Sequence, residues 1–398
     1  MSKYAFILGQ ASRLAATELL NVLNQPKNYL WQDNLLITET ELAPESLLKQ
    51  LGGTIKIAKI IASYQNLADF KTTDWCQYLE TQKLSGKFTF GFSVYHGNQK
   101  DYQHLFELAL SVKKALKPKT SIRLVTSRES ILSSVIVTKN NLLNKELLFL
   151  KTANNWQIAV TVAVQDFDDY GQRDVLRPER DAKSGMLPPK LAQMMLNLAS
   201  TDKNLTLLDP FCGSGTILQE AMLLGFKNIY GTDISQKAIA DSQANIDWLK
   251  NKYTLKNKVN LKLSDVQNLA IIFNSPRGEA GNKEIDLIVT EPFMGDAKIL
   301  SQHISSRTAG GNQVNDIILD LKKLYYQAFL SFAKICSTKA RIVFIFPAIN
   351  FQNQTIATLD KKAITSTGWQ QLHSPLGELI YQRPGQIVTR NITLWQRQ

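Results

Sequence analysis

The residues best suited to chemistry lie in the run DPFCGSGT, Asp209–Thr216, and in an acid that follows it, Asp233. An apolar stretch enters this glycine-rich turn and helix-favouring residues leave it, which predicts a strand, a tight loop and a helix. Gly213 and Gly215 would let the backbone approach a ligand, and N–H groups at the helix start can bind a carboxylate or phosphate. An acid about twenty residues further on is placed to accept hydrogen bonds from ribose hydroxyls.

This succession resembles the S-adenosylmethionine site of Rossmann-like methyltransferases. There too a strand, a glycine-rich loop and a helix are followed by a second strand that ends in an acid. The loop is most similar to those of enzymes that methylate exocyclic amines of nucleic-acid bases. The resemblance implies Asp233 at the ribose, Asp265 near the adenine amine, and Asp209 at the loop or the methionine part. The alternative is a nucleotide-binding or structural unit in which these acids are turn or cap residues. The implied cofactor-binding residues are Asp209, Pro210, Phe211, Cys212, Gly213, Gly215, Thr216, Asp233, Ile234 and Asp265.

A second motif, EPFMG at Glu291–Gly295, follows the apolar run IDLIVT. In amino methyltransferases this place carries Asp or Asn, two prolines and an aromatic residue. The lone pair of an exocyclic amine is delocalised into its ring, so oxygen acceptors that hold the NH₂ group favour a lone pair aimed at the methyl group. The aromatic ring stacks on a base rotated out of its helix. The resemblance implies a catalytic site at Glu291, Pro292 and Phe293.

EPFMG also departs from that pattern. Glu291 is one methylene longer than the expected Asp, Phe293 stands at the second proline and Met294 at the aromatic. One interpretation is a variant in which Phe293 takes the stacking role, and we adopt it here. The alternatives are weakened or lost catalysis, because alignment for methyl transfer is strict, and a plain turn with a structural acid.

The residues around these motifs predict the scaffold that must position them. Strands alternating with helices predict an α/β fold, a parallel sheet wrapped by helices with ligands at the carboxyl ends of its strands. Two final segments, GWQQLHSPL and IVTRNITLWQR, predict an antiparallel edge. The predicted parallel strands are Leu205–Asp209, Asn228–Asp233, Val259–Ser264, Ile285–Thr290 and Ala340–Pro347.

The front of the chain predicts α+β structure. YAFILG is expected as an apolar edge strand, SRLAATELLNVL as a helix capped by Ser12, NLLITET as a strand, and APESLLKQLG as a helix closed by Gly52 and Gly53. GTIKIAKIIASY returns as a strand. From about Thr72 to Ala163 we expect helices at DWCQYLETQKL and YQHLFELALSVKKALK, strands at KFTFGFSVYHG and SIRLVTS, a helix or turn at SSVIVTKNNLL, and a hairpin of ELLFLKTA with WQIAVTVAVQ.

These segments, followed by VAVQDFDDYGQRDVLRPERDAKSGMLPPKLAQMMLNLA, resemble the THUMP-containing tRNA guanine-N2 methyltransferases over essentially the whole chain. That family modifies the guanosine at position 10 of tRNA in archaea and eukaryotes. The resemblance implies that the front half grips the tRNA acceptor end and that the helix beginning near Pro189 borders the methyl-donor pocket. It implies a ferredoxin-like domain over residues 1–65, a THUMP domain over 66–165, a linker over 166–190 and a Rossmann-like methyltransferase domain over 191–398.

The segment Asp166–Pro189 is dense in charge and includes Arg173, Arg177 and Arg180. An ordinary charged interdomain linker explains these arginines equally well. The sequence singles out none of them as functional. The polar stretch SQHISSRTAGGNQVND after EPFMG fits a substrate loop or an inert one.

Composition bounds the class of protein. The 398 residues suffice for two or three domains, and the net charge of +12, positive in both halves, favours a polyanionic partner. Lysines such as Lys113 and Lys117 on one helix fit a solvated face. Three scattered cysteines and isolated histidines, among them His303 and His373, indicate neither a disulfide framework nor a metal site. No apolar run approaches a membrane span and no signal segment is evident, so a cytoplasmic protein without membrane contact is expected.

The sequence therefore predicts an S-adenosylmethionine-dependent tRNA methyltransferase that acts on the exocyclic N2 of a guanosine, most simply at position 10. Another base amine, in ribosomal RNA or DNA, is one alternative. A catalytically inactive RNA-binding relative of these enzymes is another. Eukaryotic relatives use a small activating partner, and this sequence leaves open whether the chain has one.

Overall fold

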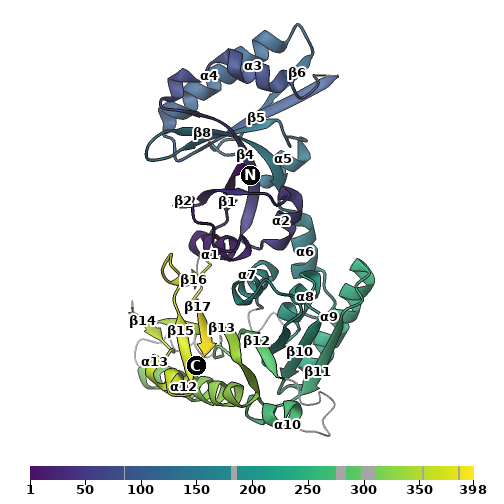
Figure 1. The fold of residues 1–398 in the computed structure, drawn as a ribbon, viewed down its shortest axis with the longest axis vertical. Helices are drawn as coiled ribbons and strands as arrows, with labels where there is room; N and C mark the ends of the chain where they lie inside the picture. The colour runs from purple at the N-terminus through teal and green to yellow at the C-terminus, as the bar shows by residue number, and fades with distance from the viewer. Residues whose placement is uncertain (85, 181–185, 275–283, 297–309, 352–353, 384–385) are drawn as a thin grey trace. The chain divides into compact units, whose positions relative to one another are not determined.

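The computed structural model describes the whole chain except residues 85, 181–185, 275–283, 297–309, 352–353 and 384–385 (Figure 1). Its contacts divide the chain into two compact units. The first comprises Met1–Ser12, Gln25–Gln50 and Thr54–Phe167. The second comprises Arg13–Asn24, Leu51–Gly53 and Asp168–Gln398.

One eight-stranded sheet runs through the first unit in the order β2-β3-β1-β4-β8-β7-β5-β6. Pairing is antiparallel from β2 to β7, while β5 lies parallel to both β7 and β6. The predicted hairpin of the last two strands is confirmed. The strands are β1 (Ser2–Leu8), β2 (Tyr29–Gln32), β3 (Leu35–Thr40), β4 (Thr54–Tyr64), β5 (Lys87–Tyr95), β6 (Ser121–Val125), β7 (Glu146–Lys151) and β8 (Trp156–Val164).

Helices α3 and α4 bury their apolar faces against this sheet in an aromatic core that includes Trp75 and Phe149 (Figure 1). Their ring centroids lie 5.4 Å apart, a separation at which aromatic pairs attract. The N-cap of α4, Asn98, accepts a hydrogen bond from the backbone of Asp101 at 2.9 Å. The helices of the first unit are α2 (Pro44–Gln50), α3 (Thr72–Glu80), α4 (Gln99–Leu116) and α5 (Ser134–Lys139), with a 3₁₀ turn η1 (Leu67–Asp69).

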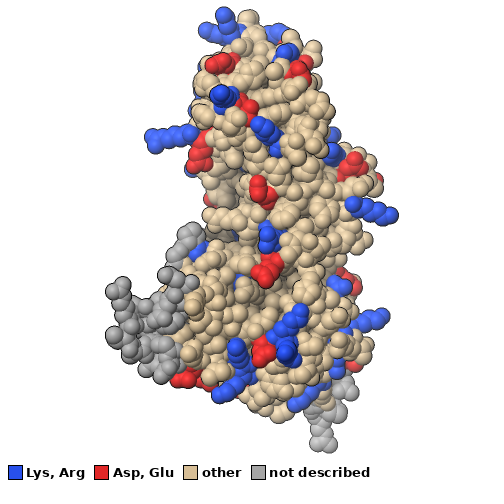
Figure 2. Space-filling view, turned by 90° about the vertical axis from the view of Figure 1, so that its left-hand side faces the viewer, with Lys and Arg blue, Asp and Glu red and all other residues tan. Residues whose placement is uncertain are grey.

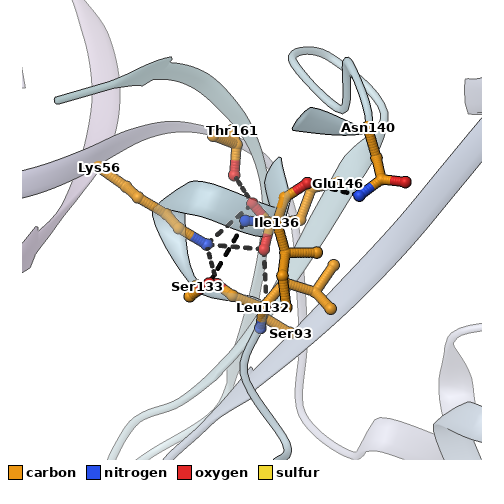
Figure 3. Close-up of polar contacts among 8 residues, drawn as sticks. All are labelled: Lys56, Ser93, Leu132, Ser133, Ile136, Asn140, Glu146 and Thr161. Atoms are coloured by element: carbon orange, nitrogen blue, oxygen red, sulfur yellow. Dashed lines mark hydrogen bonds and ion pairs between the residues drawn. The ribbon is translucent and has the colours of Figure 1, made fainter. Parts of the chain in front are cut away.

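A buried ion pair joins the middle strands of this sheet (Figure 3). Lys56 Nζ on β4 lies 2.8 Å from Glu146 Oε1 on β7, and it also donates to the carbonyl of Leu132 at 2.7 Å. Ser93 donates to one Glu146 oxygen and Thr161 to the other. With both oxygens occupied, the carboxylate is compensated inside the core.

The second unit contains the predicted α/β sheet. β11, β10, β9, β12 and β13 are parallel neighbours, and β17 continues the sheet antiparallel to β13, followed by β15. β14 pairs with β13 and β16 with β17. The strands are β9 (Thr206–Asp209), β10 (Asn228–Asp233), β11 (Lys258–Leu263), β12 (Ile285–Thr290), β13 (Cys336–Phe351), β14 (Gln354–Ala357), β15 (Trp369–Leu372), β16 (Leu379–Tyr381) and β17 (Val388–Arg397).

Helices cover this sheet through apolar side chains, and one core cluster joins Phe329 on α12 to Phe344, Trp369 and Trp395 on the strands. The strand order reverses at β9, because β10 and β11 lie on one side of it and β12 and β13 on the other. A topological switch point therefore lies at the carboxyl end of β9. The helices are α1 (Ser12–Val22), α6 (Phe167–Val175), α7 (Pro189–Ala199), α8 (Thr216–Leu223), α9 (Gln236–Tyr253), α10 (Leu269–Phe273), α12 (Gly310–Ile335) and α13 (Lys361–Thr365), with a 3₁₀ turn η2 (Val266–Asn268).

Several local predictions were wrong. YAFILG is not an edge strand, because β1 pairs on both sides and is fully buried from Ala5 to Leu8. The short β2, in which two of four residues are exposed and none is buried, was missed, since it carries no clear alternation. The predicted linker contains helix α6. β13 runs well beyond both predicted ends.

Gly52 and Gly53 follow α2 but do not adopt the left-handed conformation expected of a helix-closing glycine. Their N–H groups donate to the buried Glu18 at 2.8 and 2.9 Å. A Cβ at Gly52 would lie 2.3 Å from the carbonyl oxygen of Lys190. Close approach of another backbone, rather than φ, therefore requires glycine at residue 52.

Across the part of the chain that the structure describes, no helix combines the length and the apolar character that crossing a bilayer demands.

Candidate functional site

The glycine loop lies at the switch point between β9 and α8. Gly213 and Gly215 both have left-handed φ, 52° and 83°, which favours glycine. A Cβ at Gly215 would come within 2.9 Å of Ser242 Oγ, whereas one at Gly213 would meet nothing within 4 Å. The backbone at Gly213 therefore faces open space that a ligand can approach.

Helix α9 holds this loop from behind. Ser242 Oγ donates to the carbonyl of Gly213 at 2.7 Å, and Asn245 Nδ2 donates to that of Ser214 at 2.9 Å. Both side chains are fully buried. Two polar residues that the sequence analysis did not single out thus fix the carbonyls of Gly213 and Ser214.

Asp233 ends β10 beside the loop. One oxygen accepts from the N–H of Gly213 at 3.0 Å and the other from the N–H of Ser235 at 2.9 Å. Each carboxylate oxygen can accept a second hydrogen bond. The partly exposed side chain therefore retains acceptor capacity for ligand hydroxyls.

Asp209 is buried at the end of β9. Its Oδ1 accepts from Thr290 Oγ1 at 2.7 Å and from the N–H of Phe211 at 3.2 Å. Burial raises the pKa of Asp209 to about 7, against the lowering effect of these two donors. This side chain therefore connects the end of β9 with the start of the glycine loop and the end of β12.

The remaining loop residues are largely covered. Pro210 and Cys212 are buried, and Phe211 packs against the core cluster that includes Phe329. Burial raises the pKa of the Cys212 thiol well above its ordinary range, so it is held as the neutral thiol. Thr216 is the first residue of α8.

Asp265 lies at the rim of an open hollow of about 380 Å³. Its Oδ1 caps η2 by accepting from the N–H of Gln267 at 2.8 Å. Two isoleucines there are strongly exposed, Ile234 by 71% and Ile271 by 70%. Exposed flat apolar walls beside polar groups suit a planar ring. The lining consists of Ile234, Leu263, Ser264, Asp265, Asn268, Ile271 and Ile272.

Part of the predicted linker folds onto the glycine loop. Arg177 is 3% exposed, and its Nη1 donates to Thr216 Oγ1 at 2.6 Å. Asn245, which holds Ser214, also exchanges two hydrogen bonds of 3.0 Å with the backbone of Glu179. Burial lowers the pKa of Arg177. This arginine is therefore packed against the glycine loop rather than held in solvent.

The EPFMG motif leaves β12 at the neighbouring strand end. Glu291 Oε1 lies 2.6 Å from Nε of Arg390 on β17, and its side chain is 13% exposed. Burial raises the pKa of Glu291, and Arg390 opposes this effect. Phe293 is 58% exposed, while Tyr325 Oη donates to its carbonyl at 2.8 Å. Pro292 is buried between them.

The structure thus gathers the predicted residues at the carboxyl ends of adjacent strands in the second unit, with Asp209 joined to β12 and Asp233 joined to the loop. Residues missed by sequence reasoning are Arg177, Ser242, Asn245, Ile271 and Arg390. Only Ile271 had a local signal, because it lies in an apolar run, residues 269–273, a few residues after the acid Asp265. His303 and most of the polar stretch after EPFMG lie outside the described residues.

Residues 177–299, which include the glycine loop and EPFMG, match the family described as RMKL-like, methyltransferase domain. A tRNA (guanine(10)-N2)-dimethyltransferase of Methanocaldococcus jannaschii is 28% identical over 45% of this chain and 45% of its own length. That of Pyrococcus abyssi is 26% identical over 49% of each chain. This chain spans about half the length of these two relatives in the matched regions.

Two solved structures share the fold. TrmN from Thermus thermophilus superposes with a TM-score of 0.56 at 14% identity, over 100% of both chains. A possible methylase from Clostridium difficile 630 superposes with a TM-score of 0.50 at 14% identity, over 100% of this chain and 97% of that one. At such identity the likeness concerns the fold.

A further relative is matched over most of its own length. A probable tRNA (guanine(10)-N2)-dimethyltransferase of Methanothermococcus thermolithotrophicus is 30% identical over 37% of this chain and 82% of that relative. The methyltransferase domain match covers the same strand ends that carry the site. The chain therefore belongs to the tRNA (guanine(10)-N2)-dimethyltransferase family.

Proposed function

We propose that this chain is an S-adenosylmethionine-dependent methyltransferase that methylates the exocyclic N2 of a guanosine in tRNA, at position 10. The observation that carries the proposal is the convergence of the glycine loop, Asp233, the hollow at Asp265 and EPFMG on adjacent strand ends. The names of the relatives supply the substrate class.

The donor residues fit S-adenosylmethionine. Open space at Gly213, where a Cβ would meet no atom, suits the approach of a ligand to the loop. The acceptor capacity of Asp233 suits ribose hydroxyls, and the exposed Ile234 and Ile271 suit the faces of adenine. The N-terminus of α8, held by Arg177, suits the methionine carboxylate. The buried Asp209 orients the start of the loop through Oδ1.

When bound, S-adenosylmethionine supplies an electrophilic methyl group on a sulfonium. In the proposed reaction the N2 lone pair of guanine forms the new nitrogen–carbon bond as the carbon–sulfur bond breaks, and that electron pair stays on sulfur. Glu291 and the carbonyl of Pro292 accept hydrogen bonds from the amine, which draws the lone pair out of the ring. The nitrogen then loses one proton to solvent or to the Glu291 carboxylate.

Phe293 takes the stacking role in this proposal. More than half of the residue's surface is exposed next to Glu291, and its backbone is fixed by Tyr325. An exposed ring on a fixed backbone can stack on an extruded base, offsetting part of the unstacking cost. The variant motif thereby keeps one acceptor and one aromatic ring.

The front half binds the RNA in this proposal, with a ferredoxin-like domain at 1–65, a THUMP domain at 66–165, a linker at 166–190 and the methyltransferase domain at 191–398. The exposed lysines of α4, with Arg123, Arg128 and Lys139, supply positive charge there. On the face drawn in Figure 2, lysine and arginine side chains are interspersed with acidic ones. We place the protein in the cytoplasm, where its tRNA is, and leave a protein partner open.

The test is methyl transfer to defined RNA. Purified full-length chain is incubated with labelled S-adenosylmethionine and an unmodified tRNA transcript, which is then digested to nucleosides. We expect labelled N2-methylated guanosine that disappears when G10 of the transcript is replaced by A. Label on a different base amine would identify another acceptor, and donor binding without any labelled nucleoside on tRNA or ribosomal RNA would contradict the enzyme proposal.

A further inference from the structure

Glu291 presents a problem of placement for the proposed reaction. A glutamate has one more rotatable bond than an aspartate and carries its carboxylate about 1.5 Å further from the backbone. A hydrogen-bond acceptor for an amine has to be held in place, because misplacement by about 1 Å can slow a reaction about 100-fold. Something in this chain must therefore restrict the longer side chain.

Arg390 contacts that side chain from a strand far away in the sequence. It lies on β17, opposite Pro347 of β13 in the antiparallel register, and is 4% exposed. Its Nε is 2.6 Å from Glu291 Oε1. A short contact between two largely buried side chains on rigid strand ends fixes the carboxylate better than a surface pair would.

The second oxygen of Glu291 remains available. Among the described residues the structure gives it no hydrogen-bond partner, and it is not one of the buried atoms left without one. It is therefore the accessible part of a side chain that is otherwise covered. The guanidinium therefore holds one oxygen and leaves the other with its acceptor capacity.

We propose that Arg390 is a positioning residue that holds Glu291 by Oε1 as a carboxylate and leaves Oε2 to accept the hydrogen bond from the substrate amine. The inference rests on the proposed function. It explains how a motif with Glu in place of Asp retains a defined acceptor: the arginine compensates for the extra methylene.

The electrostatics agree with this arrangement. Among the described residues, the charged or titratable groups that interact electrostatically with the carboxylate are Arg390 on β17, Asp209 on β9 and Tyr325 on α12. Arg390 is the group that lowers the pKa of Glu291, whereas burial raises it. Without the arginine the carboxylate would ionise only at higher pH, since an opposite charge at this distance lowers a carboxyl pKa by about 1–3.

The experiment measures single-turnover methyl transfer against pH, together with the dissociation constant of S-adenosylmethionine. We expect Arg390→Gln to slow transfer about 10–100-fold and to move the acid limb of the profile upward by about one pH unit or more, with donor affinity unchanged. Arg390→Lys, which keeps the charge, should recover part of both effects. Arg341→Gln, an exposed arginine on β13, is the matched control.

Glu291→Asp gives an independent arm. It restores the residue type of related enzymes but withdraws the carboxylate from Arg390, so we expect slower transfer. If Arg390→Gln does not fold, as melting would reveal, Arg390→Lys and Glu291→Asp carry the test. Two results would overturn this inference and leave the proposed function standing. One is a wild-type rate and pH profile in the folded Arg390 variants, and the other is a Glu291→Asp variant as fast as wild type. A wild-type chain that methylates no base overturns the proposed function as well.

Discussion

Two buried ion pairs, one in each unit, use their carboxylates differently. In the first unit both oxygens of Glu146 are occupied, by Lys56, Ser93 and Thr161, and the charged side chains are at most 1% exposed. In the second unit one oxygen of Glu291 contacts Arg390, and the side chain remains 13% exposed at the end of a strand. Both pairs neutralise a charge taken out of water, yet only one leaves an acceptor free.

The difference separates a carboxylate that serves the fold from one that can serve a ligand. A buried acceptor with every lone pair used can only hold its neighbours together. An acceptor held at one point, with capacity left over, is ready for a partner. By this criterion Asp233, whose two oxygens each accept one backbone hydrogen bond and are partly exposed, belongs with Glu291.

The largest expected effect concerns the pair Lys56–Glu146, in which both carboxylate oxygens are occupied. Lys56→Met leaves the Glu146 carboxylate buried without its counter-charge, which should lower the free energy of unfolding by about 3–5 kcal/mol. Denaturant unfolding measures this change. Lys59→Met, on the same strand but exposed, should change it by less than about 0.5 kcal/mol. Equal effects of the two substitutions would remove the basis of the comparison.

The next effect concerns the carboxylate with spare acceptors. Asp233→Ala should weaken S-adenosylmethionine binding about 10–100-fold, since it removes charged hydrogen bonds to the ligand and the support of the Gly213 backbone. Calorimetric titration measures the affinity. Asp202→Ala, an exposed acid before β9, serves as the control. Unchanged affinity with Asp233→Ala would place the ribose elsewhere.

A smaller change in donor affinity is expected for a substitution of Arg177, which contacts the start of α8. Arg177→Met keeps the apolar stem but removes the donor to Thr216, so donor affinity should fall about tenfold. Arg180→Met, three residues further on and exposed, should bind as wild type does. A loss shared by both variants would mean that overall charge, rather than the Thr216 contact, matters.

A pH-dependent effect concerns Asp209. Its pKa in the folded chain, about 7, lies above that of an exposed carboxyl, roughly 3.9. The stability contributed by the protonated group is complete below about pH 4 and is lost as the pH rises through about 7. Asp209→Asn removes this loss, so its melting temperature relative to wild type should rise between pH 5 and pH 8. A difference independent of pH would show that Asp209 does not titrate in this range.

Most of the second unit could be predicted from the sequence. The strands Asn228–Asp233 and Ile285–Thr290 are confirmed to the residue as β10 and β12, because apolar runs bounded by turn residues are a local signal. The loop glycines were also predictable, since left-handed backbone and close approach are requirements of single residues. In the front half, β1 was misjudged as an edge because strand order depends on pairings that local pattern does not encode.

The sequence by itself determined the α/β alternation, the glycine loop and the acids that end successive strands, because these depend on residues close together in the chain. Only the tertiary structure decided which distant side chains complete them. Arg390 meets Glu291, Arg177 meets Thr216 and Lys56 meets Glu146 through the packing of strands and helices. The pairing of charges across a sheet is set by register and burial, and no spacing along the chain reports it.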